Sequence, residues 1–333
     1  MKRHIIIGGL SLLLLITGML LYLQFFEQDE ALLSPVGEEL AKVNRPLLKY
    51  TFDNLREYRT TPSQIRLEDV LKEEEDYTSY LFTYLSENKE VSGLANIPVK
   101  NGPFPVVIML RGFVDREIYE TGVGTRRSAE ELAKAGYITL APDFLGYGES
   151  ASPSADVFEE RFEKNTTVLN LIASIPTLDK ADSEKVGIWG HSNGGQIAIS
   201  VLEIADKPYP TVLWAPVSKP FPYSILYFTD EYDDGGKALR KVLAQFEEKY
   251  NVFYYDPANY YRWINKETPI QLHQGRVDEE VPVAWSDELY KDLQDEELDI
   301  AYFTYSQENH NFTQGQWPTT IARTIEFFDE KLK

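Results

Sequence analysis

The sequence predicts an α/β fold in which a doubly wound, mostly parallel sheet is covered by helices on both faces. From residue 105 onward, short apolar segments of strand length alternate with longer segments of helical period, as in consecutive strand–helix–strand units. The short segments, such as PVVIML at 105–110, are apolar throughout, as expected for strands buried on both faces. In such a sheet the functional loops gather at the carboxyl ends of the strands.

Two segments of alternating polarity, 77–85 and 90–99, are predicted to be antiparallel strands that open the sheet. Six further strands are predicted at 105–110, 137–141, 186–189, 211–214, 270–273 and 300–305. Helices are predicted at 128–135, 157–175, 196–204, 284–293 and 319–331. Together these elements define one domain over residues 76–333.

The connection between the strands at 211–214 and 270–273 is far longer than an ordinary one, so residues 218–268 are predicted to form a helical cap insertion. Thirteen of its residues are aromatic. These rings either line a pocket over the sheet, which would favour hydrophobic substrates over charged ones, or pack into the cap's own core.

Composition restricts the classes of function. The chain of 333 residues has 53 acidic and 33 basic side chains and a formal net charge of −20, which repels phosphate backbones. Nucleic acid is therefore not expected as a partner. There is no cysteine, which excludes disulfides, thiolate metal sites and a cysteine nucleophile.

The N-terminal region contains 19 consecutive residues without a charge, residues 5–23, which nearly span a hydrocarbon core of roughly 30 Å as a helix. Lys2 and Arg3 precede this run and acidic residues follow it, so residues 1–26 are predicted to be a transmembrane signal-anchor with the remainder outside the cytoplasm. A cleaved secretory signal is the alternative. Residues 27–75 are predicted to be a linker or packed arm, with the charged run 72–76 as a solvated helix end.

The segment GHSNG at 190–194 matches the pattern G-x-S-x-G and stands between an apolar strand and a helical segment. This is the context of a nucleophile elbow, in which a serine is held on a tight strand-to-helix turn and its hydroxyl is exposed. Ser192 is therefore the candidate nucleophile. A serine hydroxyl is a poor nucleophile unless a base takes its proton, so a histidine is required further along the chain.

The chain has four histidines. His4 belongs to the predicted anchor, His191 lies inside the elbow, and His273 falls within an apolar strand, where a hydrogen-bonded core histidine is expected. His310 remains, in a polar loop between the last strand and the last helix, and is the candidate base.

The carboxylate that orients the base is expected between the serine and the histidine, after the preceding strand. Asp278 meets this condition in the loop GRVDEEVP. Glu279 and Glu280 are adjacent, but acids at a helix entry are more simply explained by the helix dipole.

An oxyanion hole requires two backbone N–H donors, and we predict those of Asn193 and of Phe113, in the loop after Leu110. Three arginines near this loop either brace it or face an anionic substrate group: Arg111, Arg126 and Arg127.

Over residues 77–331 the sequence resembles the α/β-hydrolases, and more narrowly the catalytic domain of the prolyl oligopeptidase family of serine peptidases. The resemblance lies in FPVVIMLRGF, YITLAPDFLGYGES, GHSNGG, PIQLHQGRVDEEVPVAWSDELYKDL and NHNF. It implies Ser192 as nucleophile, Asp278 as acid and His310 as base, and a structural role for Asp143. The sequence departs from the pattern at Arg111, where relatives often carry histidine. No β-propeller is expected, because fewer than a hundred residues precede the predicted hydrolase domain.

These observations predict a membrane-anchored serine hydrolase that cleaves a small peptide, aminoacyl or ester substrate through an acyl-enzyme, without metal or cofactor. A carboxylesterase and an acyltransferase require the same triad and are alternatives. A non-catalytic binding module on the same scaffold is the alternative from another class. The oligomeric state is not predicted.

Overall fold

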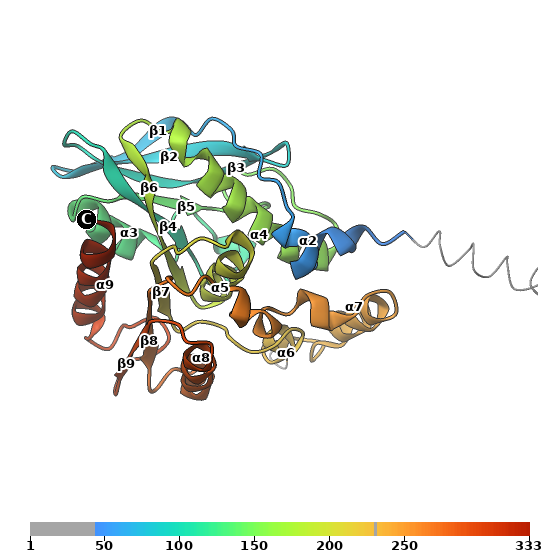
Figure 1. Cartoon of the computed structure of the whole chain (residues 1–333). Helices are drawn as coiled ribbons and strands as arrows, with labels where there is room; N and C mark the ends of the chain where they lie inside the picture. The colour runs from blue at the N-terminus through green and yellow to red at the C-terminus, as the bar shows by residue number, and fades with distance from the viewer. Residues whose placement is uncertain (1–43, 230–231) are drawn as a thin grey trace, which may run out of the picture. The chain divides into compact units, whose positions relative to one another are not determined.

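The computed structural model describes residues 44–229 and 232–333, and its sheet has the strand order β1-β2-β3-β5-β4-β6-β7-β8-β9 (Figure 1). The strands are β1 Arg66–Glu73, β2 Tyr77–Ser86, β3 Lys89–Pro98, β4 Phe104–Leu110, β5 Ile138–Pro142, β6 Ala181–His191, β7 Thr211–Trp214, β8 Ile270–Gly275 and β9 Ile300–Tyr305. The β1–β2, β2–β3 and β3–β5 pairs are antiparallel and the remaining pairs are parallel. The predicted α/β class with a mostly parallel sheet is confirmed.

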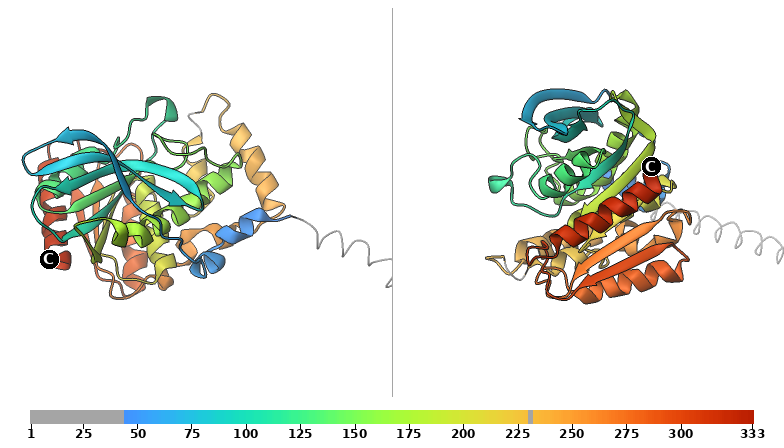
Figure 2. Two further views of the ribbon diagram at one scale, coloured as in Figure 1. Left: turned by 90° about the horizontal axis from the view of Figure 1, so that it is seen from above. Right: turned by 90° about the vertical axis from the view of Figure 1, so that its left-hand side faces the viewer.

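Helices cover both faces of the sheet (Figures 1 and 2). On one face lie α3 Arg126–Lys134 and α9 Trp317–Leu332, and on the other lie α4 Val157–Ser174, α5 Asn193–Ala205 and α8 Val283–Asp295. Alternate residues of β4 enter different cores, since Val106 and Ile108 pack with α4 and α5 whereas Val107 and Met109 pack with α3 and α9. This arrangement explains why the strand is apolar at every position.

The strand β1 was not predicted, and the expectation of a helix end over residues 72–76 is wrong. Residues 66–73 pair with β2 in an antiparallel register. Every one of these residues is exposed, so no alternation of apolar and polar side chains marks the strand. A charged outer strand is a common way to protect a sheet edge from further pairing.

The segment before β1 packs on the domain. It contains the 3₁₀ helix η1 Pro46–Tyr50 and the short helix α2 Phe52–Arg56, which Thr51 caps by accepting a hydrogen bond from a backbone N–H. The side chains of Leu47, Tyr50, Phe52 and Leu55 are buried in the same core as α4 and α5.

The connection between β7 and β8 contains α6 Tyr223–Leu226, α7 Lys237–Glu247 and the 3₁₀ helices η5 Val252–Tyr255, η6 Pro257–Asn259 and η7 Tyr261–Trp263. Several of its rings, including Phe221 and Phe246, contact Phe158 and Phe162 of α4. Six aromatic residues of this segment are buried in the core: Phe221, Phe246, Tyr250, Tyr255, Tyr260 and Tyr261. Phe221, Phe246 and Tyr255 therefore join the cap to α4, and Phe221 and Tyr255 also line a small cavity.

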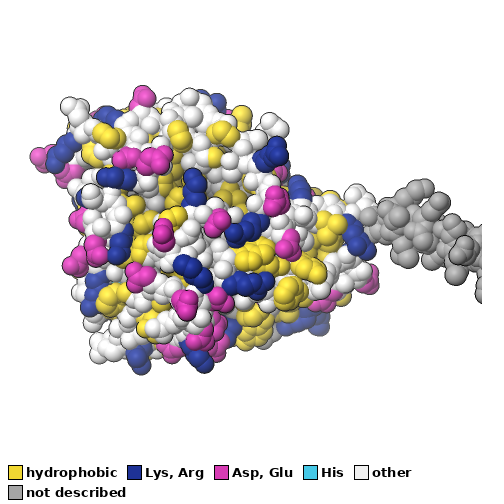
Figure 3. Space-filling view, viewed as in Figure 1, with side chains coloured by type: hydrophobic (Ala, Val, Ile, Leu, Met, Phe, Trp, Pro, Cys, Tyr) yellow, Lys and Arg dark blue, Asp and Glu magenta, His cyan; other side chains and the backbone are white. Residues whose placement is uncertain are grey.

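The predicted membrane helix, residues 5–23, lies outside the described residues. Within residues 44–229 and 232–333, no helix has both the length and the apolar character needed to cross a bilayer. On the face in Figure 3, acidic and basic side chains are interspersed, so the net negative charge forms no single-sign patch there.

Replacing Glu203 of α5 by Met should raise the free energy of unfolding, because this carboxyl is fully buried and, within the described chain, neither oxygen has a hydrogen-bond partner. Burial, followed by the charge of Asp256, raises the pKa of Glu203 well above its ordinary value of 4.5. Above pH 4.5 the folded protein retains a proton that the unfolded chain loses, so the wild-type side chain costs more stability as the pH rises.

The gain from Glu203→Met, on the order of 1–3 kcal/mol, should therefore be larger at pH 8 than at pH 5. Urea unfolding at both pH values measures it, with the exposed Glu184→Met as control. A variant that is less stable than wild type at pH 8 would contradict this account.

Candidate active site

Ser192 occupies the turn between β6 and α5 with φ +56° and ψ −122°, a conformation that residues with a side chain rarely adopt. Its N–H donates to the carbonyl of Trp214 at 2.9 Å, and its carbonyl accepts from the N–H of Val217 at 3.0 Å. Gly194 packs so closely that a Cβ there would lie 2.0 Å from the carbonyl oxygen of Leu110. The elbow therefore requires glycine at position 194 because there is no room for a side chain.

Asp278 and His310 come from the loops after β8 and β9, and they meet at the same edge of the sheet. His310 Nδ1 lies 2.9 Å from Asp278 Oδ2, and the side chains are 8% and 0% exposed. The other carboxylate oxygen accepts from the backbone N–H groups of Glu280 and Val281. Burial alone would raise the pKa of Asp278, but the hydrogen bond and charge of His310, with these two N–H groups, hold it below its ordinary value.

The imidazole of His191 joins the elbow to the loop of His310. His191 Nε2 donates to the backbone carbonyl of His310 at 3.0 Å, and the centroids of the two rings are 4.6 Å apart. Burial, followed by the charge of His310, lowers the pKa of His191 to about 3, so the ring stays neutral. The residue before the nucleophile thereby fixes the backbone that carries the candidate base.

No hydrogen bond joins the Ser192 hydroxyl to His310 among the described residues. Such bonds are often long in unliganded sites and shorten when substrate arrives. Together with the His191 hydrogen bond, the structure therefore brings the serine turn and the Asp278–His310 pair to one edge of the sheet.

His273 is a core residue, as its strand context predicts. It is completely buried, with Nδ1 2.8 Å from the Tyr305 hydroxyl and Nε2 2.8 Å from Gln271 Oε1. Burial, followed by the charge of Arg323, lowers its pKa to about 3.

The loop after β4 passes directly over the nucleophile. A Cβ on Gly112 would lie 3.0 Å from the Ser192 Cβ, so a side chain there would push the loop and the nucleophile apart by a few tenths of an ångström. Phe113 follows, with its side chain 71% exposed. Asn193 is the first residue of α5, and the first N–H groups of a helix have no intrahelical partner.

Arg111 braces this loop from inside. Its guanidinium donates to the carbonyls of Gly112 at 2.9 Å and Asp143 at 3.0 Å. It lies over the rings of Tyr119 and Tyr147, at 4.5 and 4.1 Å from their centroids. Since the side chain is only 5% exposed, Arg111 shapes the loop and does not face a substrate.

The Asp143 carboxylate accepts hydrogen bonds from the hydroxyls of Ser92, Tyr119 and Thr121. It is completely buried, and burial raises its pKa in spite of these bonds. Its contacts agree with the structural role that the resemblance implies.

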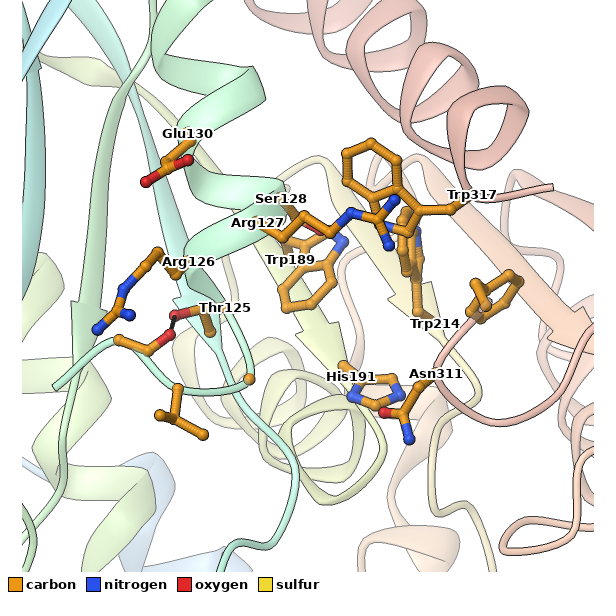
Figure 4. A pocket seen from close by; sticks show the side chains of 14 residues that line it. Thr125, Arg126, Arg127, Ser128, Glu130, Trp189, His191, Trp214, Asn311 and Trp317 are labelled. Carbon is orange, nitrogen blue, oxygen red and sulfur yellow. Dashed lines mark hydrogen bonds between the residues drawn. The ribbon is translucent and has the colours of Figure 1, made fainter. Parts of the chain in front are cut away.

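Arg126 and Arg127 border a cavity of about 430 Å³ (Figure 4). His191 and Asn311 form part of its wall, whereas the reactive side chains of the candidate triad do not. The Arg127 guanidinium lies 3.7 Å from the ring centroid of Trp317, and Arg126 donates to a backbone carbonyl of its own loop.

Sequence reasoning missed one buried residue that supports the acid. Gln274 donates through Nε2 to Asp278 Oδ2 at 2.9 Å, and its Oε1 accepts from the Ser286 hydroxyl at 2.7 Å. The available signal was a polar residue in the apolar strand IQLHQG, four positions before Asp278. Within the described ranges, no three His, Asp or Glu side chains are grouped so that they could hold a metal ion.

Comparison with known proteins agrees with this geometry. The sequence profile of the prolyl oligopeptidase family matches residues 125–333. The uncharacterized peptidase YtmA of Bacillus subtilis is 23% identical over 243 residues, which cover 70% of this chain and 86% of that protein.

Two solved structures show the same fold. Acetyl xylan esterase 1 from Thermoanaerobacterium sp. aligns with a TM-score of 0.57 and 15% identity over 84% of this chain and 92% of its own. The acylaminoacyl peptidase of Pyrococcus horikoshii aligns with a TM-score of 0.61 and 19% identity over 78% of this chain and 42% of its own. The chain thus has the α/β-hydrolase fold and belongs to the prolyl oligopeptidase family, as a serine hydrolase of peptidase or esterase type.

Proposed function

We propose that the chain cleaves peptide, aminoacyl or ester bonds through an acyl-enzyme formed on Ser192. The Asp278–His310 pair, held beside the strained serine turn, is the observation that carries this proposal. His310 removes the proton of the Ser192 hydroxyl while the oxygen attacks the substrate carbonyl. Asp278 holds the imidazole so that Nε2 faces the serine, and it stabilises the imidazolium that forms.

The negative charge that develops on the carbonyl oxygen is stabilised by the backbone N–H groups of Asn193 and Phe113. His310 then donates its proton to the leaving amine or alcohol, and the acyl group remains as an ester of Ser192. Water, activated by the same histidine, hydrolyses that ester and restores the free serine. A carboxylesterase uses the same steps, and an acyltransferase replaces water by another acceptor.

We also propose that residues 1–26 anchor the enzyme in a membrane, with the catalytic domain on the extracytoplasmic side. The support is the uncharged run 5–23 with basic residues before it and acidic residues after it.

Ser192→Ala, His310→Ala and Asp278→Asn should each lower kcat/KM by roughly 10³-fold or more, because triad members act as a unit. The assay compares an aminoacyl p-nitroanilide with the p-nitrophenyl ester of the same acyl group, and the ratio of the two rates separates a peptidase from an esterase. Glu279→Gln and Glu280→Gln are the matched controls and should stay close to wild type. Near-wild-type turnover by Ser192→Ala, or a larger loss in a control than in Asp278→Asn, would contradict the assignment.

Gln274→Met should lower kcat roughly 10–100-fold, because Asp278 loses the side-chain donor that holds its carboxylate toward His310. The pH dependence of kcat separates this effect from a loss of folded protein, since only a changed acid–base pair moves its acidic limb. Gln294→Met, an exposed change on α8, is the control. An unchanged kcat and pH profile would show that Gln274 does not position the acid.

The full-length protein should remain with membranes after alkaline carbonate extraction, whereas a chain that begins at Glu27 should be released with unchanged kcat/KM. Protease added outside intact cells should digest the catalytic domain of the full-length protein. Release of the full-length protein by carbonate would contradict the anchor, and protection from the protease would contradict its orientation.

A further inference from the structure

Two basic side chains of α4, Arg161 and Lys164, face a small cavity beside the nucleophile. They are three positions apart and therefore lie on the same side of the helix. The cavity also has Asn193, the residue after the nucleophile, in its wall and a volume of about 30 Å³. This volume admits a group of only a few atoms.

The acidic side chains of α4 do not neutralise this pair. Each acid has a basic partner on another element: Glu159 with Lys49, Glu160 with Arg116, and Glu163 with Lys89. Arg161 donates to the side-chain oxygen of Gln196, and the Lys164 ammonium lies 5.9 Å from the ring centroid of Phe144. In the described part of the chain, neither base has a carboxylate within ion-pair distance. Both are partly buried, and a charge withdrawn from water without a counter-ion costs stability.

The surrounding charges keep this site electropositive. The pKa of Lys164 is lowered to about 8, first by burial and then by the charges of Arg161, Arg111 and Arg116, against the opposing charge of Glu160. Burial lowers the pKa of Arg161 to about 10, so it stays protonated at neutral pH. A negative charge bound in the cavity would favour the protonated forms of Arg161 and Lys164 and would raise their pKa values again.

The position of the cavity indicates which half of the substrate it meets. The proposed base donates its proton to the leaving group, so the leaving group lies toward the loop of His310. The cavity is lined by α4, α5, Phe52 of α2 and the cap residues Phe221, Tyr255 and Pro257, and none of its described lining residues comes from the loop of His310. A substrate group bound in this cavity therefore belongs to the acyl half of the substrate, the half that remains on Ser192 in the acyl-enzyme.

We propose that Arg161 and Lys164 bind a carboxylate at the end of the acyl group, so that the enzyme prefers acyl groups with a terminal carboxylate over uncharged ones. The planar carboxylate suits the remaining donors of a guanidinium beside an ammonium. This inference rests on the proposed acyl-enzyme mechanism. It departs from the hydrophobic preference predicted from the aromatic content of residues 218–268, because the buried rings there pack against α4.

The test compares mono-p-nitrophenyl esters of adipic, pimelic and suberic acid with p-nitrophenyl esters of the unsubstituted acids of the same length, using the full-length enzyme. We expect kcat/KM for the best carboxylate ester to exceed that of its uncharged counterpart at least tenfold. Lys164→Met and Arg161→Met should each remove most of this preference and leave the uncharged ester within about twofold of wild type. Lys185→Met, which removes an exposed charge elsewhere, is the matched control.

The pH dependence supplies a second measure. The preference should decline as the pH rises above the pKa of Lys164 in the complex, and Lys164→Arg should keep it at high pH because a guanidinium stays charged. Esters that carry the carboxylate on the phenol leaving group should show no increase in kcat/KM over their uncharged counterparts.

Equal rates on charged and uncharged esters, or a preference that survives in both Met variants, would overturn the inference and leave the proposed function intact. A preference for a carboxylate on the leaving group would overturn the assignment to the acyl half. If wild type and Ser192→Ala were equally inactive on every ester, the proposed function would fail, and the inference with it.

Discussion

The left-handed backbone of Ser192 is the constraint on which the rest of the site depends. A residue with a side chain adopts this conformation only where its surroundings enforce it, at a cost of about 1–3 kcal/mol. Here the enforcing contacts are the hydrogen bonds to Trp214 and Val217 and the close packing of Gly194 on Leu110. Because these partners lie at or just beyond the ends of β7 and β4, which flank β6, the parallel sheet must be in register before the turn can be held.

The same sheet edge supplies the acid and the base. Asp278 follows β8 and His310 follows β9, and these parallel strands are hydrogen-bonded neighbours, so their loops leave the sheet side by side. Gln274, in β8 itself, fixes the carboxylate, and His191, at the end of β6, fixes the backbone of His310. The site is thus held by strand residues of the scaffold, which gives the acid–base pair little freedom to rotate.

The elements with strong local signals were predictable from the sequence. The strands at 211–214 and 300–305 have the predicted bounds, because short apolar runs between turns leave little ambiguity. The Asp278–His310 contact was predicted from the order of the two residues in the chain, the place of each in a loop after a strand, and the elimination of the other histidines. β1 was missed because an exposed outer strand carries no alternating pattern. The role proposed for the two basic residues of α4 could not be predicted from the sequence. Arg161 and Lys164 look like part of an ordinary solvated helix face until the ion-pair partners of the neighbouring acidic residues are known.

Covalent labelling with a fluorophosphonate, followed by peptide mapping, tests the central claim most directly. Such a reagent reacts with a serine only when a base activates its hydroxyl and donors stabilise the oxyanion. We expect one adduct per chain, located on Ser192, absent from Ser192→Ala and formed far more slowly in His310→Ala. An adduct on another residue, or equal labelling of wild type and Ser192→Ala, would contradict the account.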